Sequence, residues 1–137
     1  TSAPAIADYI VDVLAKAGLE MEDKADFNPH RAAIRRFAEM TNEERAAAIA
    51  ENPQYGRVIC RCETITEAEI VEAIHRGARS IDGVKRRTRA GMGRCQGGFC
   101  SPRVMELLSR ETGMPMETLT KFGGKSNLLF GKLKEVH

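Results

Sequence analysis

The chain has 137 residues, of which 42% are hydrophobic, and it contains no tryptophan. This length suits one domain or two small ones. The formal net charge of +2, from 21 basic and 19 acidic residues, is too small to favour nucleic acid or an anionic membrane as a partner. No apolar run approaches the roughly 20 residues that a membrane-spanning helix needs, and no secretory signal is visible, so we expect a chain without a direct membrane span in a reducing cytoplasm.

The first residues predict an amphipathic helix. Pro4 suits the first turn of a helix, apolar residues recur at helical spacing from Ile6 to Leu14, and Gly18 follows as a stop signal. Such a helix is expected to dock on another surface. The chain opens with TSAPAIADYI, without an initiator methionine, and we interpret it as a piece of a longer protein, with simple removal of the methionine as the alternative.

The rest of the segment up to about residue 55 also predicts helices only. Asn28 and Pro29 form a cap and first-turn pair that predicts a helix through Phe37. Thr41 and Glu44 have the spacing of a capping box, which predicts a further helix. The basic run HRAAIRR at residues 30–36 is interpreted as a solvated helix face, and nothing in this segment carries visible chemistry.

Helix signals continue after residue 56. Thr66 and Glu69 again have capping-box spacing, and Gly77 ends the helix that they predict. Ser80 can cap a second helix that runs toward Thr88. A third helix is predicted to begin at Ser101–Pro102 and to stop at Gly113. After it, MPMETLTKF predicts one more turn of helix, and SNLLFGKLKEVH predicts an extended end.

All of the cysteines lie in this second part, in two pairs that adjoin predicted helix starts: Cys60 with Cys62, and Cys95 with Cys100. A disulfide between Cys60 and Cys62 would close a ring too short for relaxed geometry. Inert buried thiols do not explain two pairs, so metal binding is the remaining interpretation. C-x-C spacing is unusual for structural zinc, whereas iron–sulfur clusters also take four thiolates, so the spacing favours iron–sulfur and leaves zinc open.

The residues around the cysteines resemble a known family. The runs ICRCETITEAEIVEAI and DGVKRRTRAGMGRCQGGFC are similar to the cluster-binding domain of the bacterioferritin-associated ferredoxin family. This resemblance implies a mainly α fold, a small helical domain with a helix-turn-helix-like module. It also implies one 2Fe-2S cluster, with Cys60, Cys62, Cys95 and Cys100 as its ligands.

A longer resemblance concerns the parent protein. KRRTRAGMGRCQGGFCSPRV, together with TSAPAIA and DFNPHR, is similar to the C-terminal end of FAD-dependent dehydrogenases that resemble the anaerobic glycerol-3-phosphate dehydrogenase large subunit. It implies that residues 1–55 are a helical linker or docking segment and that residues 56–137 are the 2Fe-2S-binding domain with its tail. No G-x-G-x-x-G motif follows a strand, so FAD is expected in a flavin domain outside these residues.

The implied function is to relay electrons between flavin and an acceptor, without catalysis by this chain alone. The expected partners are the flavin domain and an electron acceptor or membrane-anchoring subunit, which could place the protein peripherally at the inner membrane; nucleic acid is not expected. Arg61 and Arg94 are candidates for offsetting the charge of the cluster, and Gly93, Gly97 and Gly98 for letting the backbone approach it. The neighbouring cations at residues 85–89 are candidates too, although a solvated helix face explains Lys85 and Arg86 better.

Three alternatives remain open at this stage. The first is a zinc-stapled scaffold or interaction domain without a redox role, and zinc could also substitute for iron in the same site. The second is a nucleic-acid-binding helix-turn-helix, which the balanced charge disfavours. The third is thiol chemistry by the C-x-C pair, with Arg61 lowering a thiol pKa. The histidines, His30, His75 and His137, lack metal-ligand spacing.

Overall fold

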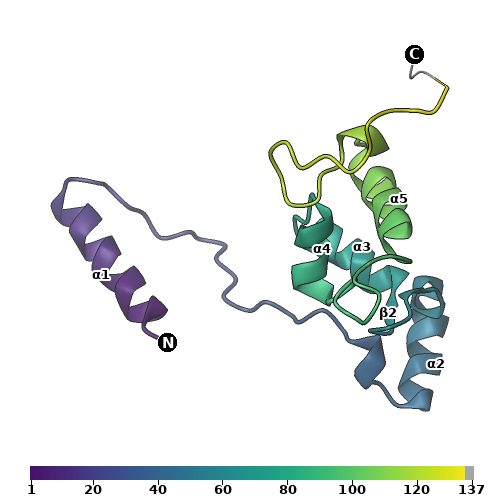
Figure 1. The fold of residues 1–137 in the computed structure, drawn as a ribbon. Coiled ribbons are helices and arrows are strands. Elements are labelled where there is room, and N and C mark those ends of the chain that lie inside the picture. The colour runs from purple at the N-terminus through teal and green to yellow at the C-terminus, as the bar shows by residue number, and fades with distance from the viewer. Residues whose placement is uncertain (135–137) are drawn as a thin grey trace. The chain divides into compact units, whose positions relative to one another are not determined.

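A computed structural model describes residues 1–134 of the chain, and these residues are mainly helical, as expected (Figure 1). No helix within them is both long and apolar enough to cross a membrane. The elements in chain order are α1 (Ala3–Lys16), η1 (Phe37–Glu39), α2 (Asn42–Glu51), η2 (Pro53–Gly56), β1 (Val58–Cys60), β2 (Ile65–Thr66), α3 (Glu67–His75), α4 (Ile81–Thr88), α5 (Ser101–Thr112) and η3 (Met116–Thr118).

The chain forms two compact units, Thr1–Ala32 and a second unit that begins at Ala33. The first unit contains the predicted amphipathic helix, α1, which has a proline in its first turn and ends just before Gly18 at a φ of +91°. No residue of α1 is buried, and Tyr9 on its apolar face is 66% exposed. The helix is confirmed, whereas its docking on another surface stays a prediction.

The helix predicted from Pro29 through Phe37 is wrong. Asn28 does accept a hydrogen bond from the His30 amide at 2.9 Å, but irregular chain follows until the short η1 turn. The physical reason is that this segment has little apolar surface to bury, while Arg31 and Arg35 would repel each other four residues apart on a helix. Only Phe37 at its end is buried.

The capping box at Thr41 is confirmed as the start of α2. The Thr41 amide donates to the Glu44 carboxylate at 2.7 Å, and the Glu44 amide donates back to the Thr41 hydroxyl at 3.3 Å. α2 and η2 belong to the same compact unit as the cysteines, because η2 packs on α3. The division of the chain near residue 55 therefore stays a prediction about the parent protein rather than a boundary between these compact units.

The core of the second unit lies between α3, α4 and α5, which pack side by side (Figure 1). Its most deeply buried apolar side chains are Ile70, Ile74, Val84, Leu108 and Leu119, each with 1% exposure or less. Two of the cysteines belong to the same cluster of buried residues, Cys60 at the end of β1 and Cys100 just before α5. The helical core therefore fixes one cysteine of each sequence pair.

The other two predicted caps in this unit are also confirmed, and the one at Thr66 is buried. The Thr66 amide and hydroxyl donate to the Glu69 carboxylate at 2.8 and 2.7 Å, and neither residue is more than 2% exposed. Ser80 caps α4 by accepting a hydrogen bond from the Gly83 amide at 3.1 Å. Because the Thr66 cap directly follows β2, it fixes where the short hairpin ends and α3 begins.

A buried carboxylate connects the segments that carry the cysteines. The Glu67 side chain, 5% exposed at the start of α3, lies 3.3 Å from the Arg57 guanidinium and 2.8 Å from that of Arg110. The contact with Arg110 is a close ion pair, but its geometry does not meet the criteria for a hydrogen bond to the Glu67 Oε1 atom. Because Arg57 precedes β1 and Arg110 lies on α5, Glu67 ties both elements to α3.

The C-terminal segment has the predicted extra turn, η3, followed by chain without helix up to residue 134. An isolated bridge pairs Thr120 with Asn127, after which Phe130 is 96% exposed. Residues 126–134 contain no helix and end in a turn at 133–134, so an extended end stays a prediction. Residues 135–137, including His137, lie outside the described residues.

Because the cap at Thr66 is buried and the cap at Thr41 is exposed, we expect alanine to lower the free energy of unfolding more at Thr66 than at Thr41. Thr66→Ala removes a hydroxyl that donates to a buried carboxylate, so we expect it to lower the free energy of unfolding by about 2 kcal/mol. The matched variant Thr41→Ala, at the exposed capping box, should cost about 1 kcal/mol or less. Urea unfolding of both proteins measures the difference, and an equal or larger loss for Thr41→Ala would contradict this account.

Candidate metal centre

The first cysteine pair lies at the end of a short hairpin strand. β1 pairs antiparallel with β2, and Cys60 lies opposite Ile65 after an irregularity in the register. Cys60 is 1% exposed, whereas Cys62, two residues later, is exposed. Thr64, with a φ of +53°, turns the chain back into β2. One thiol of the pair thus points into the core and the other toward solvent.

The second pair lies in the loop between α4 and α5. The chain leaves α4 through Arg89 in the left-handed conformation, and Gly91, Gln96 and Gly97 also have positive φ angles. These residues wind a tight loop that ends at Cys100, which is 3% exposed directly before α5, while Cys95 is half-buried. The same division into an inner and an outer thiol is repeated here.

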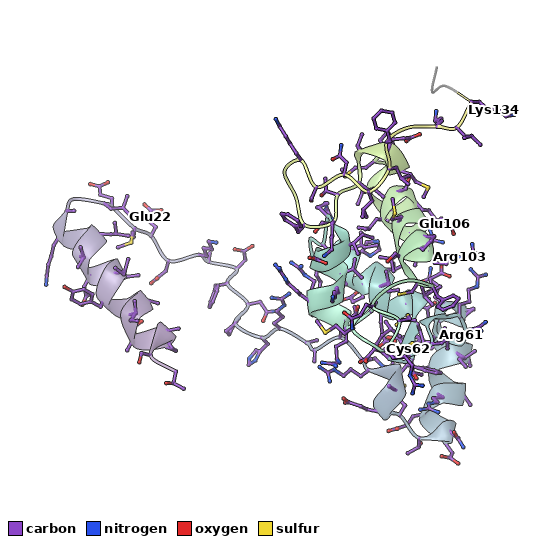
Figure 2. All side chains as sticks on the ribbon, viewed as in Figure 1. Glu22, Arg61, Cys62, Arg103, Glu106 and Lys134 are labelled. Carbon is purple, nitrogen blue, oxygen red and sulfur yellow. The ribbon has the colours of Figure 1, made fainter. Side chains whose placement is uncertain are left out.

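All four thiols are free and line one cavity of about 520 Å³. Figure 2 shows Cys62 on the side of the second unit that also carries Arg61 and Arg103. The remaining lining residues are Val58, Ile59 and Phe99. The cavity thus brings the four predicted ligands together and divides them into an inner pair, Cys60 and Cys100, and an outer pair, Cys62 and Cys95. Their binding of one cluster stays a prediction.

The outer pair has the spacing of two ligands on one metal ion. The Cys62 and Cys95 sulfurs lie 3.7 Å apart although the residues are 33 positions apart in sequence. Two thiolates at about 2.3 Å from one tetrahedral ion would lie roughly 3.8 Å from each other. No group of three Cys, His, Asp or Glu side chains within residues 1–134 is arranged to hold one ion. The donor set and its spacing therefore fit a centre in which thiolates bind in pairs.

Cys95 and Cys100 differ in how well they tolerate negative charge. Backbone hydrogen bonds from Phe99 and then Gly97 lower the pKa of the Cys95 thiol, with a smaller contribution from Cys62. Burial, and then the neighbouring Cys60, raises the pKa of the Cys100 thiol to about 11. The surroundings of Cys95 thus stabilise a thiolate, whereas those of Cys100 disfavour one unless a cation is bound.

Two of the three candidate glycines are sterically constrained. A methyl group at Gly93 would collide with the Cβ atom of Cys62, and one at Gly97 would lie 2.7 Å from the Ser101 hydroxyl. Gly97 also has a φ of +86°, which disfavours any side chain. Gly98 is less constrained, since its nearest neighbour, the Cys95 carbonyl oxygen, would lie 3.2 Å away. A direct role of these glycines toward a cofactor stays a prediction.

The candidate cations fall into two groups. Arg61 lines the cavity and Arg94 adjoins Cys95, and both are exposed without an ion pair in the described part of the chain. Arg89 instead pairs with Glu63 at 2.8 Å, and Arg87 donates to the Gly83 carbonyl of its own helix at 3.0 Å. Arg61 and Arg94 thus remain available to offset charge in the cavity, which stays a prediction.

Sequence reasoning missed three residues at this site. Glu63, through its ion pair with Arg89, connects the two cysteine loops. Phe99 lines the cavity and is 87% exposed, and Arg103 on α5 lines it as well. Glu63 and Phe99 each adjoin a cysteine in sequence, so position next to a ligand was the available signal. His75 does not line the cavity; its Nε2 atom contacts Glu111 at 2.9 Å.

The contact between Gly93 and Cys62 predicts a position-specific effect. Gly93→Ala should force the two cysteine loops apart and strongly reduce metal bound per chain, with little loss of helix. Gly56→Ala is the matched control, because its methyl group would meet only the Ile49 side chain at 3.5 Å. Metal analysis and far-UV circular dichroism measure the two effects. Unchanged metal content in Gly93→Ala would show that metal binding does not require the close approach of Gly93 to Cys62.

Comparisons with known proteins agree with this geometry. Residues 58–110 match the family described as the BFD-like [2Fe-2S] binding domain. Glycerol 3-phosphate dehydrogenase of Caloramator mitchellensis is 52% identical over 136 residues, which are 98% of this chain and 28% of that protein. No solved structure matches the chain.

Two further relatives match shorter segments. Hydrogen cyanide synthase subunit HcnB of Pseudomonas aeruginosa is 41% identical over 83 residues, 61% of this chain and 17% of that protein. One subunit of the anaerobic glycerol-3-phosphate dehydrogenase of Escherichia coli K12 is 37% identical over 65 residues, 47% of this chain and 12% of that protein. The chain thus spans less than a third of the length of each of these relatives. Residues 58–110, which contain all four cysteines, therefore match the BFD-like [2Fe-2S] binding domain.

Proposed function

We propose that this chain is the iron–sulfur electron-transfer part of an FAD-dependent oxidoreductase similar to glycerol-3-phosphate dehydrogenase. Its role is to relay electrons between a flavin and an acceptor. The observation that carries the proposal is the single cavity lined by four free cysteines, with Cys62 and Cys95 at the spacing of two ligands on one ion. The similarity over 98% of the chain to a glycerol 3-phosphate dehydrogenase supports the assignment of the parent protein.

The four cysteines would hold one 2Fe-2S cluster, with Cys62 and Cys95 on one iron and Cys60 and Cys100 on the other. This pairing follows from the division into an outer and an inner pair, since each iron takes two thiolates. The bound cluster supplies one-electron transfer. A single zinc ion is less well supported, because the family match concerns a 2Fe-2S domain and the thiols are grouped in pairs.

The residues around the cysteines would set the properties of the site. Four thiolates, two sulfides and two ferric ions sum to about −2, so the exposed cations Arg61 and Arg94 would favour the uptake of an electron. Gly93 would let the second cysteine loop pass close to Cys62, and Gly97 and Gly98 would present backbone amides to Cys95. α3 and α4 would then act as a helix-turn-helix-like support for the cluster rather than as a reader of nucleic acid.

The remaining parts of the enzyme would come from outside this chain. Hydride removal from a hydroxy substrate needs a flavin, and FAD would reside in a separate domain of the parent protein. Residues 1–55 would serve as the docking segment between that domain and the cluster, since α1 presents an unburied apolar face. The electron acceptor or a membrane-anchoring subunit would be a further partner, and the cytoplasm the expected location.

This division of labour predicts a redox-active chain that lacks catalysis of its own. After anaerobic reconstitution with iron and sulfide, the chain should take up about one electron per cluster from dithionite and return it to ferricyanide. It should not oxidise glycerol 3-phosphate, because the cofactor that performs this chemistry is absent. Visible absorption follows both reactions, with flavin assayed in the same sample.

Two results would overturn the proposal. The first is bleaching of the cluster by glycerol 3-phosphate in a flavin-free sample. The second is a protein that binds iron but shows no reversible reduction. The Cys100→Ala variant provides a control, because it leaves no ligand atom at this position of the inner pair and should abolish the reversible signal.

A further inference from the structure

The two cysteine pairs lie in very different surroundings. Cys60 and Cys100 are 1% and 3% exposed and belong to the apolar core, together with Ile65 and Val104. Cys62 is exposed and Cys95 is half-buried at the open end of the same cavity. A negative charge added next to the inner pair would be buried away from water, and burying a charge in an apolar environment costs free energy. The outer pair does not carry this cost.

Polar groups reinforce the difference. The backbone of Phe99 and Gly97 favours negative charge on the Cys95 sulfur, and polar groups of this kind stabilise additional negative charge at a metal that the sulfur binds. Arg61 and Arg94, which are exposed and form no ion pair among the described residues, directly precede the two outer cysteines in sequence. Arg61 also lines the cavity with Cys62. Hydrogen bonds, solvent and positive charge are therefore all concentrated at the outer end.

We propose that Cys62 and Cys95 hold the iron that is reduced, whereas the iron on Cys60 and Cys100 stays ferric in both redox states. The inference rests on the proposed function and deepens it by assigning the electron to one end of the site. In this step one electron passes from the reductant, dithionite in the test below, to one ferric ion, which becomes ferrous. No thiolate bond forms or breaks, and no proton is taken up.

The assignment has a consequence for electron transfer. The reduced iron lies at the open end of the cavity, beside the exposed Phe99 ring. An electron therefore enters and leaves through the face that contains Cys62, without crossing the apolar core between α3 and α5. The inner pair has a different task, which is to anchor the site in that core.

Paramagnetic proton NMR of the dithionite-reduced, reconstituted chain tests the assignment directly. Cysteine β-protons on ferric iron show large downfield shifts that shrink on warming, whereas those on the ferrous iron show smaller shifts that grow on warming. We expect the ferrous pattern for Cys62 and Cys95 and the ferric pattern for Cys60 and Cys100. Selective labelling at the cysteine β-carbon, with contacts from Cys60 to its neighbour Ile65, identifies the individual resonances.

Matched variants give a second readout. Cys62→Ser places oxygen on the iron proposed to be reduced and should lower the reduction potential and alter the electron paramagnetic resonance signal more than Cys60→Ser does. The wild-type NMR measurement keeps the proposal testable if either variant fails to bind iron. Ferrous-type resonances from Cys60 or Cys100, or one pattern shared by all four cysteines, would overturn it. A chain that binds no iron would instead refute the proposed function, so the two failures are distinguishable.

Discussion

The site depends on the close passage of two backbone segments. Cys62 and Cys95 are 33 residues apart in sequence, yet their sulfurs lie within 3.7 Å because the loop after α4 passes directly over the Cβ atom of Cys62 at Gly93. Neither segment is regular structure at this point, so the helices and the hairpin around them must hold the contact. The ion pair between Glu63 and Arg89 connects the two loops, and the ion pairs of Glu67 with Arg57 and Arg110 tie β1 and α5 to α3.

The same arrangement explains why each sequence pair combines one buried cysteine with one that is accessible to solvent. Cys60 and Cys100 lie in the helical core, which places one thiol from each loop where a charge is disfavoured. The other thiol of each loop lies at the mouth of the cavity: Cys62 is two positions after Cys60, and Cys95 is five positions before Cys100. A group bound by all four thiolates is then anchored at one end and accessible at the other. This polarity suits a relay that must keep its cofactor and still exchange electrons with a partner.

Local sequence signals predicted the elements that depend on local contacts. The capping boxes at Thr41 and Thr66 and the cap at Ser80 form as expected, because their partners lie three residues away. The cap signal at Asn28 predicted a helix that is absent, because a cap cannot replace the apolar burial that residues 30–36 lack.

At the site, sequence reasoning named the four cysteines and the constrained glycines from their spacing and loop composition. It could not separate the inner thiols from the outer ones, because that division depends on how α3, α4 and α5 pack. The ion pair between Glu63 and Arg89 and the place of Arg103 at the cavity also join residues far apart in sequence, which no local pattern reveals.

The central claim is that the four cysteines hold one iron–sulfur cluster. Iron, zinc and acid-labile sulfide should be measured on the chain purified and reconstituted without oxygen, together with its visible absorption. We expect about two irons and about two sulfides per chain and a brown protein, since four thiolates are available for two irons. A colourless protein with about one zinc per chain and no sulfide, even after reconstitution, would contradict the account.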